Sequence, residues 1–188
     1  VILDDGFQEY KIKNKINIIC FNQHQLIGNG LVLPSGPLRE SLKSLNNANI
    51  ILINGEEDGN FEKKILKINK NLKIFYSFYK PLNIEQFKKK KLVALASIGN
   101  PNNFFKLLND HNLNVKKKLV YPDHYKFSDK QIENIIFEAE KDDYHIIMTE
   151  KDFSKFKYHK SNRLNFLKVS LELKKIERFL NEIKEIYA

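Results

Sequence analysis

The chain has 188 residues, 42% of them hydrophobic, which allows one or two cores and excludes disorder caused by low hydrophobicity. No apolar run approaches the roughly 20 residues of a membrane-spanning helix. The net charge of +9 comes almost entirely from lysine, since only three of 32 basic residues are arginine, and the abundant Ile and Asn share AT-rich codons with Lys. We therefore interpret the charge as a solvated surface and expect no nucleic-acid partner, with a lysine-rich nucleic-acid-binding module as the alternative.

Short apolar runs alternate with helical patterns along the whole chain. Strands are predicted at 1–3, 16–21, 49–54, 72–78, 92–98, 117–121, 144–149 and 165–170. Helices are predicted at 37–47, 60–69, 101–111, 129–142 and 173–187. Strands rich in Ile, Val and Leu that alternate with helices indicate an α/β fold, with mostly parallel sheets and helices on both faces.

A polar stretch divides these elements into two groups. Residues 79–91 contain Pro81 and end in four consecutive lysines, which is typical of a linker or a solvated crossover. The predicted domains are therefore residues 1–85 and residues 86–188.

The first apolar run, Val1-Ile2-Leu3, leads directly into Asp4, Asp5 and Gly6. In open parallel sheets, ligands bind beyond the carboxyl ends of the strands. Carboxylates at such a position can hold Mg²⁺, although an Asp-Gly pair is equally typical of a simple turn. Because the chain begins with valine, we also expect that a preceding part was removed or is missing from the sequence.

The strand predicted at 16–21 contains Cys20, the single cysteine. We expect this thiol to be buried in the apolar run. A lone buried thiol fits a reducing compartment and excludes a disulfide within the chain.

The segment 28–40 is dense in glycine and proline and ends in Arg39 and Glu40. A helix is predicted to start at Pro37, which would place both residues in its first turn. Backbone N–H groups and a guanidinium at that point make a phosphate site, whereas the alternative is a rigid loop with a surface arginine. The scarcity of arginine favours the functional interpretation.

Polar clusters also follow three strands of the second half. Ser97-Ile98-Gly99-Asn100-Pro101 reads as a structural strand–helix turn, and Thr149-Glu150-Lys151-Asp152 as a capping and salt-bridge cluster. In Tyr121-Pro122-Asp123-His124-Tyr125, the aspartate can orient or charge the neighbouring histidine, which can then relay a proton. Ser128 and Gln131 predict a capping box for the helix that follows.

Several catalytic motifs are absent. The sequence has no CxxC, HExxH or GxSxG, which leaves zinc proteases and serine hydrolases without support. It also has no GxxxxGK[ST], the loop that cradles phosphates in P-loop enzymes.

An ordered series of motifs runs along the chain: DDGFQ, GNG, LPSGPLRE, a strand ending in Asn54, SIGNPNNFF, PDHY and TEKDFSK. In this order the motifs resemble the tetraacyldisaccharide 4′-kinase family, the lipid A 4′-kinases of Gram-negative bacteria. The resemblance spans nearly the whole chain. It implies a P-loop-NTPase-like α/β fold, with an incomplete N-terminal domain and a smaller Rossmann-like C-terminal domain. It also implies transfer of the γ-phosphate of ATP, with Mg²⁺, to the 4′-hydroxyl of a tetraacyldisaccharide 1-phosphate.

The same resemblance implies the setting of the reaction. The expected partners are the lipid A disaccharide precursor, ATP and the anionic surface of the bacterial inner membrane. The enzyme would be peripheral at the cytoplasmic face and attached through its N-terminal part. In the family the P-loop and a further catalytic aspartate precede DDGFQ, so this chain alone is expected to be inactive.

The resemblance assigns roles in the first domain. It makes Asp4 and Asp5 catalytic residues and ligands of Mg²⁺. It places Gln8 near the lipid sugar, and it turns Arg39 and Glu40 towards the phosphates and the substrate.

In the second domain, the resemblance makes Asp123 and His124 catalytic. His124, beside Asp123, would approach the reaction from this domain and support the aspartate base that precedes DDGFQ. A histidine–aspartate pair of this kind can adjust the base in a reaction dominated by positioning and charge neutralisation.

The chain departs from the family pattern at four positions: Glu9 and Tyr125 stand where histidine is usual, Asn22 where an acidic residue is common, and Ser97 where glycine is frequent. These differences concern the expected contacts with the lipid headgroup. A P-loop phosphotransferase with another acceptor is the remaining alternative, and LPSGPLRE favours the lipid kinase over it.

Overall fold

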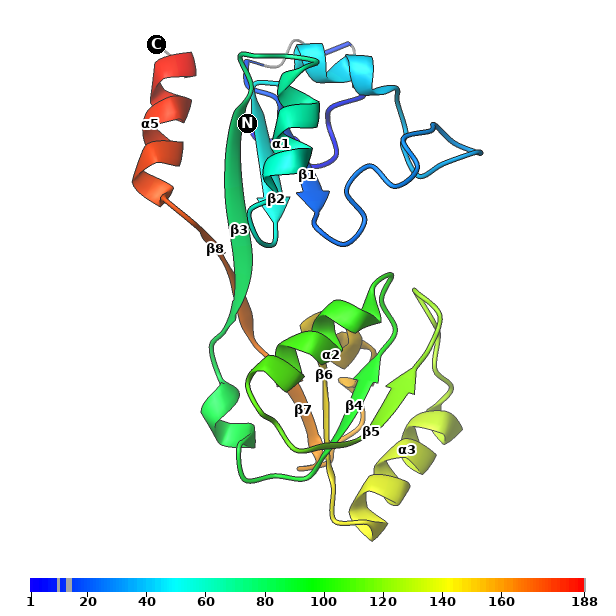
Figure 1. Ribbon diagram of the computed structural model, residues 1–188. Helices are drawn as coiled ribbons and strands as arrows, with labels where there is room; N and C mark the ends of the chain where they lie inside the picture. The colour runs from blue at the N-terminus through cyan, green and yellow to red at the C-terminus, as the bar shows by residue number, and fades with distance from the viewer. Residues whose placement is uncertain (10, 13–14, 188) are drawn as a thin grey trace. The chain divides into compact units, whose positions relative to one another are not determined.

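The computed structural model describes residues 1–9, 11–12 and 15–187 (Figure 1). The described part of the chain forms two compact units, residues 1–79 with 171–188 and residues 80–170. The chain leaves the first unit within strand β3 (Lys73–Pro81) and returns to it within β8 (Val169–Leu173). The contacts therefore divide the chain a few residues before the boundary expected after residue 85, and they group the C-terminal helix with the N-terminal half.

The described residues of the first unit are built on a sheet with the strand order β1-β2-β3-β8. Strands β1 (Ile18–Asn22) and β2 (Ile50–Asn54) are parallel, as are β2 and β3. Helix α1 (Gly59–Leu66) packs Phe61 and Ile65 into one core cluster with residues of β2 and β3 (Figure 1). Its N-terminus is capped by the Asp58 side chain, which accepts the N–H groups of Asn60 and Phe61. A 3₁₀ helix, η1 (Leu42–Asn47), precedes β2.

Helix α5 (Ile176–Tyr187) completes the first unit. The ring of Phe179 meets Phe75 of β3 edge-on, with ring centroids 5.2 Å apart. Lys73 of β3 also forms an ion pair of 3.1 Å with Glu182. The C-terminal helix thus packs against β3, although almost one hundred residues separate them in sequence.

The second unit contains a parallel sheet with the order β5-β4-β6-β7 among its described residues. Its strands are β4 (Leu92–Ala96), β5 (Val115–Val120), β6 (His145–Thr149) and β7 (Leu164–Leu167). Its helices are α2 (Pro101–Asp110), α3 (Asp129–Lys141) and the short α4 (Glu150–Phe153), with 3₁₀ turns η2 (Ile84–Phe87) and η3 (Ser154–Phe156).

Both faces of this second sheet are covered. Ala94 of β4 joins a cluster with Phe104 and Leu108 of α2, while its neighbour Leu95 joins Ile132 of α3 in another cluster. Successive side chains of a strand point to opposite faces, so α2 and α3 cover opposite sides of the sheet. The predicted α/β class with mostly parallel sheets and flanking helices is confirmed.

Four local predictions are wrong. Residues 1–3 form no strand and are exposed, because a strand needs a hydrogen-bonded neighbour and none of the described residues provides one. The helix predicted at 37–47 is reduced to η1, and the strand predicted at 165–170 is divided between β7 and β8. Cys20 is exposed and not buried, since it lies on β1 at the edge of its sheet.

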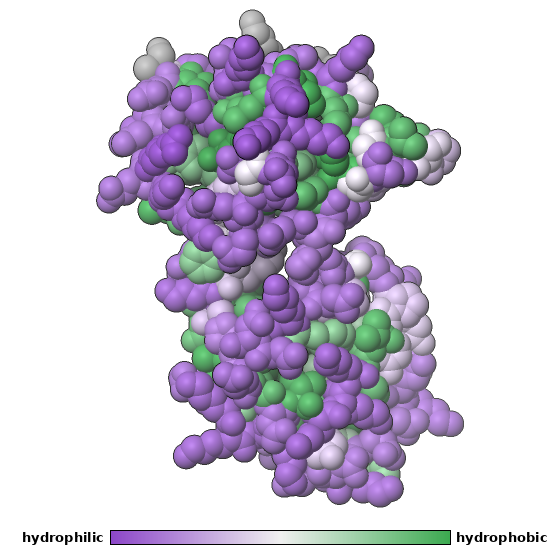
Figure 2. Space-filling view, in the orientation of Figure 1, coloured by the Kyte–Doolittle hydropathy of each residue, from purple (hydrophilic) through white to green (hydrophobic). Residues whose placement is uncertain are grey.

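The surplus of lysine is a surface property. Among the described residues no lysine is buried, and the buried polar side chains are Ser77, Ser97 and Asp152. Figure 2 shows hydrophilic residues over most of the visible face. In the described part of the chain, no helix combines the length and the apolar character needed to cross a membrane.

Candidate functional site

Asp5 and Arg39 form the first candidate centre. Arg39 donates from Nη1 to both carboxylate oxygens of Asp5, at 2.7 Å each. The two residues are 34 positions apart, so the contact joins the DDGFQ segment to LPSGPLRE within the first unit. Asp5 lies in a turn with φ of 54°, which an Asp-Gly sequence accommodates easily.

This ion pair is open to solvent, with side-chain exposures of 61% for Arg39 and 67% for Asp5. The hydrogen bond to Asp5 and the charge of that carboxylate raise the pKa of Arg39, which keeps the guanidinium charged. Exposed ion pairs contribute only about 0–1 kcal/mol to stability. Both side chains can therefore exchange partners at little cost to the fold, which suits residues that contact a ligand.

A rigid loop presents Arg39. A Cβ on Gly36 would lie 2.2 Å from Oδ1 of Asn29 and 2.3 Å from the carbonyl oxygen of Leu31, so only glycine fits there. Asn29 also accepts the N–H of Leu31 and donates to the carbonyl of Ser35. Arg39 follows this loop in an irregular segment, and η1 begins only at Leu42.

The prediction that Arg39 and Glu40 lie in the first turn of a helix is therefore wrong. The chain between Leu31 and Leu38 folds back on itself, with Leu33 N–H donating to Leu38 and Leu38 N–H donating to Leu31. These bonds form an isolated β-bridge between Val32 and Leu38 in place of the expected helix. The loop therefore offers the side chain of Arg39, without helix N-terminal amides, as an anion contact.

The remaining site residues predicted in the first unit are Asp4, Gln8 and Glu40. Asp4 is exposed, whereas Gln8 and Glu40 are half-buried. Among the described residues no group of three or more His, Cys, Asp or Glu is arranged to hold a metal ion. Mg²⁺ usually takes one or two carboxylates and completes its shell with substrate phosphates and water, so the two neighbouring carboxylates Asp4 and Asp5 fit an ion that arrives with a nucleotide.

A second centre follows β5 in the other unit. Oδ1 of Asp123 accepts the N–H of His124 at 2.9 Å and lies 3.4 Å from Nζ of Lys151. Nε2 of His124 lies 3.9 Å from the other oxygen, Oδ2. The Asp123 carboxylate therefore lies between the ring of His124 and the amino group of Lys151. The sequence analysis did not identify Lys151 as a neighbour of Asp123.

Asp123 is held in its charged form. Desolvation raises the pKa of its carboxyl, but the hydrogen bond from His124 N–H and the charges of Lys151 and His124 outweigh it, and the net pKa is lowered. The backbone of His124 has φ of 58°, an uncommon value for a residue with a side chain. The His124 side chain is 78% exposed, so it is free to meet a substrate.

The second unit also contains a buried cluster of polar side chains around Asp152. Asp152 is fully buried and accepts hydrogen bonds from the backbone N–H and hydroxyl of Ser97, from the Thr149 hydroxyl and from Lys155. Desolvation raises the pKa of Asp152, but these Ser97 and Lys155 contacts outweigh it and lower the pKa. The cluster ties the end of β4 to the end of β6, which confirms the structural interpretation of Ser97 and of the Thr149–Asp152 segment.

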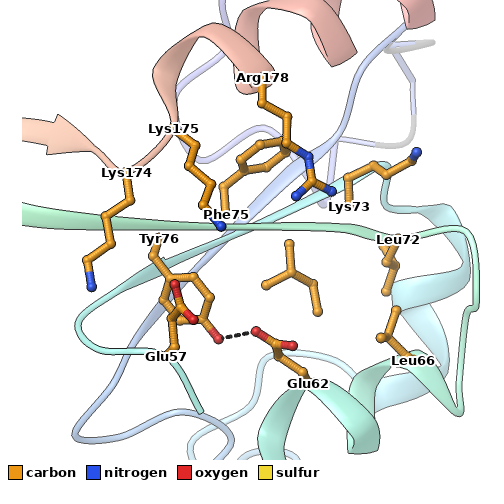
Figure 3. Close-up of a pocket in the computed structure, with 11 residues that line it drawn as sticks. Glu57, Glu62, Leu66, Leu72, Lys73, Phe75, Tyr76, Lys174, Lys175 and Arg178 are labelled. Atoms are coloured by element: carbon orange, nitrogen blue, oxygen red, sulfur yellow. Dashed lines mark hydrogen bonds between the residues drawn. The ribbon is translucent and has the colours of Figure 1, made fainter. Parts of the chain in front are cut away.

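A cavity of about 320 Å³ lies elsewhere in the first unit, beside α1, β3 and the C-terminal segment (Figure 3). Tyr76 donates to Glu62 at 2.6 Å within it, and Lys175 and Arg178 line the same cavity. Burial and the bond to Glu62 raise the pKa of Tyr76 to about 12. None of the site residues predicted from sequence lines this cavity.

A model of the LpxK family, described as tetraacyldisaccharide-1-P 4′-kinase, matches residues 1–187. A tetraacyldisaccharide 4′-kinase of Pelagibacter ubique (strain HTCC1062) is 38% identical over 185 residues, which cover 97% of this chain and 59% of that protein. A tetraacyldisaccharide 4′-kinase of Francisella tularensis subsp. novicida (strain U112) is 31% identical over 182 residues, covering 92% of this chain and 55% of that protein.

A solved structure is similar in fold. It is LpxK from Aquifex aeolicus in complex with ATP, with a TM-score of 0.67 and 22% sequence identity, covering 97% of this chain and 56% of that one. The chain thus spans between half and two thirds of the length of each of these proteins.

Proposed function

The chain belongs to the tetraacyldisaccharide-1-P 4′-kinase family, and from this premise we propose that it takes part in ATP-dependent phosphorylation of a lipid. The acceptor is the 4′-hydroxyl of a tetraacyldisaccharide 1-phosphate, and the reaction is a step of lipid A biosynthesis. The contact between Arg39 and Asp5 carries the proposal, because it brings together DDGFQ and LPSGPLRE, the motifs richest in phosphate-binding chemistry.

The first unit would supply charge neutralisation. Asp4 and Asp5 would hold Mg²⁺, which when bound neutralises charge on the phosphates of ATP. The Arg39 guanidinium would bind a phosphate oxygen in place of the Asp5 carboxylate, since planar guanidinium donors match phosphate geometry. Gln8 would lie near the sugar of the acceptor, and Glu40 would face the phosphates and the substrate.

The second unit would supply proton chemistry. The Asp123 carboxylate accepts the backbone N–H of His124 and carries a negative charge 3.9 Å from Nε2 of the ring. The carboxylate would orient the ring, and His124 would support the base that accepts the proton of the 4′-hydroxyl. Lys151 would help to hold the Asp123 carboxylate in position.

The direct test is a product assay with the protein expressed from its full reading frame. Incubation with ATP, Mg²⁺ and tetraacyldisaccharide 1-phosphate should give a product heavier by one phosphate at the 4′ position, identified by mass spectrometry and NMR. A matched reaction with the deacylated disaccharide tests the alternative of another acceptor. Absence of the 4′-phosphorylated lipid, or preference for the deacylated sugar, would reject the proposal.

The 188-residue chain by itself is expected to behave differently. It has no GxxxxGK[ST] loop, so it lacks the backbone cradle that binds the phosphates of ATP in P-loop enzymes. We expect no turnover and only weak ATP binding by calorimetric titration. Micromolar affinity would contradict this expectation.

We further propose that the protein works at the cytoplasmic face of the bacterial inner membrane as a peripheral protein. The net charge of +9 and the exposed lysines support attraction to anionic lipid. In sedimentation with vesicles, binding should require anionic lipid and should be released by salt. Equal binding to neutral vesicles, or no binding to either, would count against this location.

A further inference from the structure

Polar side chains lie side by side across three parallel strands of the first unit. In the strand register, Asn22 of β1 pairs with Asn54 of β2, and Asn54 pairs with Ser77 of β3. Residues paired across parallel strands point to the same face of the sheet, so these side chains form one row. The row lies at the carboxyl ends of β1 and β2 and includes Ser77 within β3, and ligands of open parallel sheets bind beyond the carboxyl ends of strands.

Two members of this row are buried without a partner. Nδ2 of Asn54 and Oγ of Ser77 are both inaccessible to solvent and make no hydrogen bond to any described residue. Ser77 as a whole is only 1% exposed. Asn22 differs, because its Oδ1 accepts the N–H of His24 at 3.0 Å.

Unpartnered polar groups of this kind work against folding. A buried donor or acceptor left without a hydrogen bond costs about 1–3 kcal/mol, and native structures contain few of them. Valine or isoleucine at these strand positions would avoid the cost. The side chains of Asn54 and Ser77 therefore need an explanation outside the stability of this unit, and a bound ligand provides one.

The backbone around the row is fixed in place. Gln23 N–H donates to the carbonyl of Asn54 at 3.0 Å, and Gly55 N–H donates to that of Ser77 at 2.9 Å. Gly55 has φ of 144°, and a Cβ there would lie 2.3 Å from Oε1 of Gln23, so no other residue fits without movement. Oε1 of Gln23 in turn accepts the N–H of Glu56 at 2.8 Å. Hydrogen bonds thus connect the loops after β1 and β2. They fix the position of the row at the carboxyl ends of these two strands.

We propose that Asn54 and Ser77 recognise the base of the nucleotide substrate, an inference that rests on the proposed kinase function. The row carries no formal charge and offers both donors and acceptors, so it matches an uncharged group that also carries both. An asparagine amide offers one donor and one acceptor edge, which can pair with the N6 and N7 atoms of adenine. Asn54 is only partly buried as a residue, so rotation of its amide turns Nδ2 towards a ligand.

Ser77 would contribute a second hydrogen bond. Its buried hydroxyl can donate or accept and rotates to suit its partner, so it can bond the amide of Asn54 once that amide turns towards the base, and so hold the amide in place. Sugar hydroxyls of the lipid acceptor offer similar uncharged chemistry. The experiment therefore compares the two substrates separately.

The test uses the protein from its full reading frame with Asn54→Ala, Ser77→Ala and, as a matched control, the exposed Asn134→Ala on α3. Asn54→Ala should raise KM for ATP about tenfold or more, and Ser77→Ala should raise it several-fold. The preference for ATP over GTP in kcat/KM should fall towards one. KM for the lipid, and kcat at saturating ATP, should stay near the wild-type values, as should all constants of Asn134→Ala.

Folding and binding are followed separately from turnover. Ser77→Ala removes an orphaned buried hydroxyl and should melt at or above the wild-type temperature, so its effect on KM cannot come from unfolding. Calorimetric titration with ATP needs no lipid and should show weaker binding for both variants than for Asn134→Ala.

Each other outcome is decisive. If the wild type makes product but both variants keep the wild-type KM and base preference, the inference is wrong and the kinase proposal stands. A rise in the lipid KM alone would place the row at the acceptor sugar, which also overturns the inference. If the wild type makes no product, the kinase proposal fails, and the calorimetric comparison still decides whether Asn54 and Ser77 bind the nucleotide.

Discussion

At the scale of single residues, Arg39 joins the motifs of the first unit through its contact with Asp5. Replacing it by alanine should lower turnover about 100- to 1000-fold, because a positioned donor to developing phosphate charge is lost. The melting temperature should hardly change, since the ion pair is exposed. Steady-state kinetics and calorimetry measure both effects. Arg163→Ala, which removes the ion pair with Asp143, is the control and should keep its turnover.

His124 gives a second prediction at this scale. His124→Ala should lower turnover by orders of magnitude while the fold survives, because the side chain is 78% exposed and contributes no buried contact. Kinetics with the full-length protein at saturating ATP and lipid measure the effect. The neighbouring exposed Lys126→Ala serves as the control for this loop. Near-normal turnover of His124→Ala would remove this residue from the site.

Asp152 should make the second unit sensitive to acid. Its pKa is lowered on folding, so its ionised form stabilises the fold above the usual aspartate pKa of about 4, and this stability is lost as the pH falls below that value. Asp152→Asn should cost about 3–5 kcal/mol at neutral pH, because Lys155 then loses its partner in a buried cluster.

Urea unfolding of Asp152→Asn at neutral pH and near pH 3 measures both effects. The variant should lose less stability on acidification than the wild type. Glu150→Gln, an exposed change in the same helix, is the control. Equal acid sensitivity of the wild type and Asp152→Asn would show that Asp152 does not set it.

At the scale of elements, helix α3 begins with the capping box predicted from sequence. The Ser128 side chain accepts the N–H of Gln131, and the Gln131 side chain accepts the N–H of Ser128. Ser128→Ala should therefore lower the free energy of unfolding by about 1 kcal/mol. Ser41 precedes η1 but makes no capping bond with its side chain, so Ser41→Ala should cost much less. Similar losses in the two variants would argue against the capping explanation.

The strands and helices also show where a local sequence pattern is sufficient to predict secondary structure. The apolar runs that became β2, β4 and β6 are buried along most of their length, so their hydrophobicity reports directly on burial. The failures at 1–3 and 37–47 have another origin. A strand exists only with a paired neighbour, and the bond pattern between Leu31 and Leu38 competes successfully with a helix that starts at Pro37. Neither condition can be read from a window of sequence.

At the scale of the whole molecule, each unit has its own core. The buried residues of two clusters all lie within 80–170, and those of the third lie within 27–76. Residues 80–170 expressed alone should therefore unfold cooperatively in urea with a protected sheet. A fragment 1–79 should be much less stable, because it lacks the Phe179 contact with Phe75 and the Glu182 contact with Lys73. Non-cooperative unfolding of 80–170 would contradict the division.

The sequence by itself determined the α/β class, most strands and helices, and the ordered motifs that identify the family. These depend on local periodicity and on residue types that can be read along the chain. Only the tertiary structure decided that Asp5 meets Arg39, that Lys151 shares Asp123, that Asp152 is buried beneath Ser97, and that Asn54 and Ser77 lie unpartnered in one row. These contacts join residues 23 to 55 positions apart, and their geometry is set by strand order and register, which no local pattern encodes.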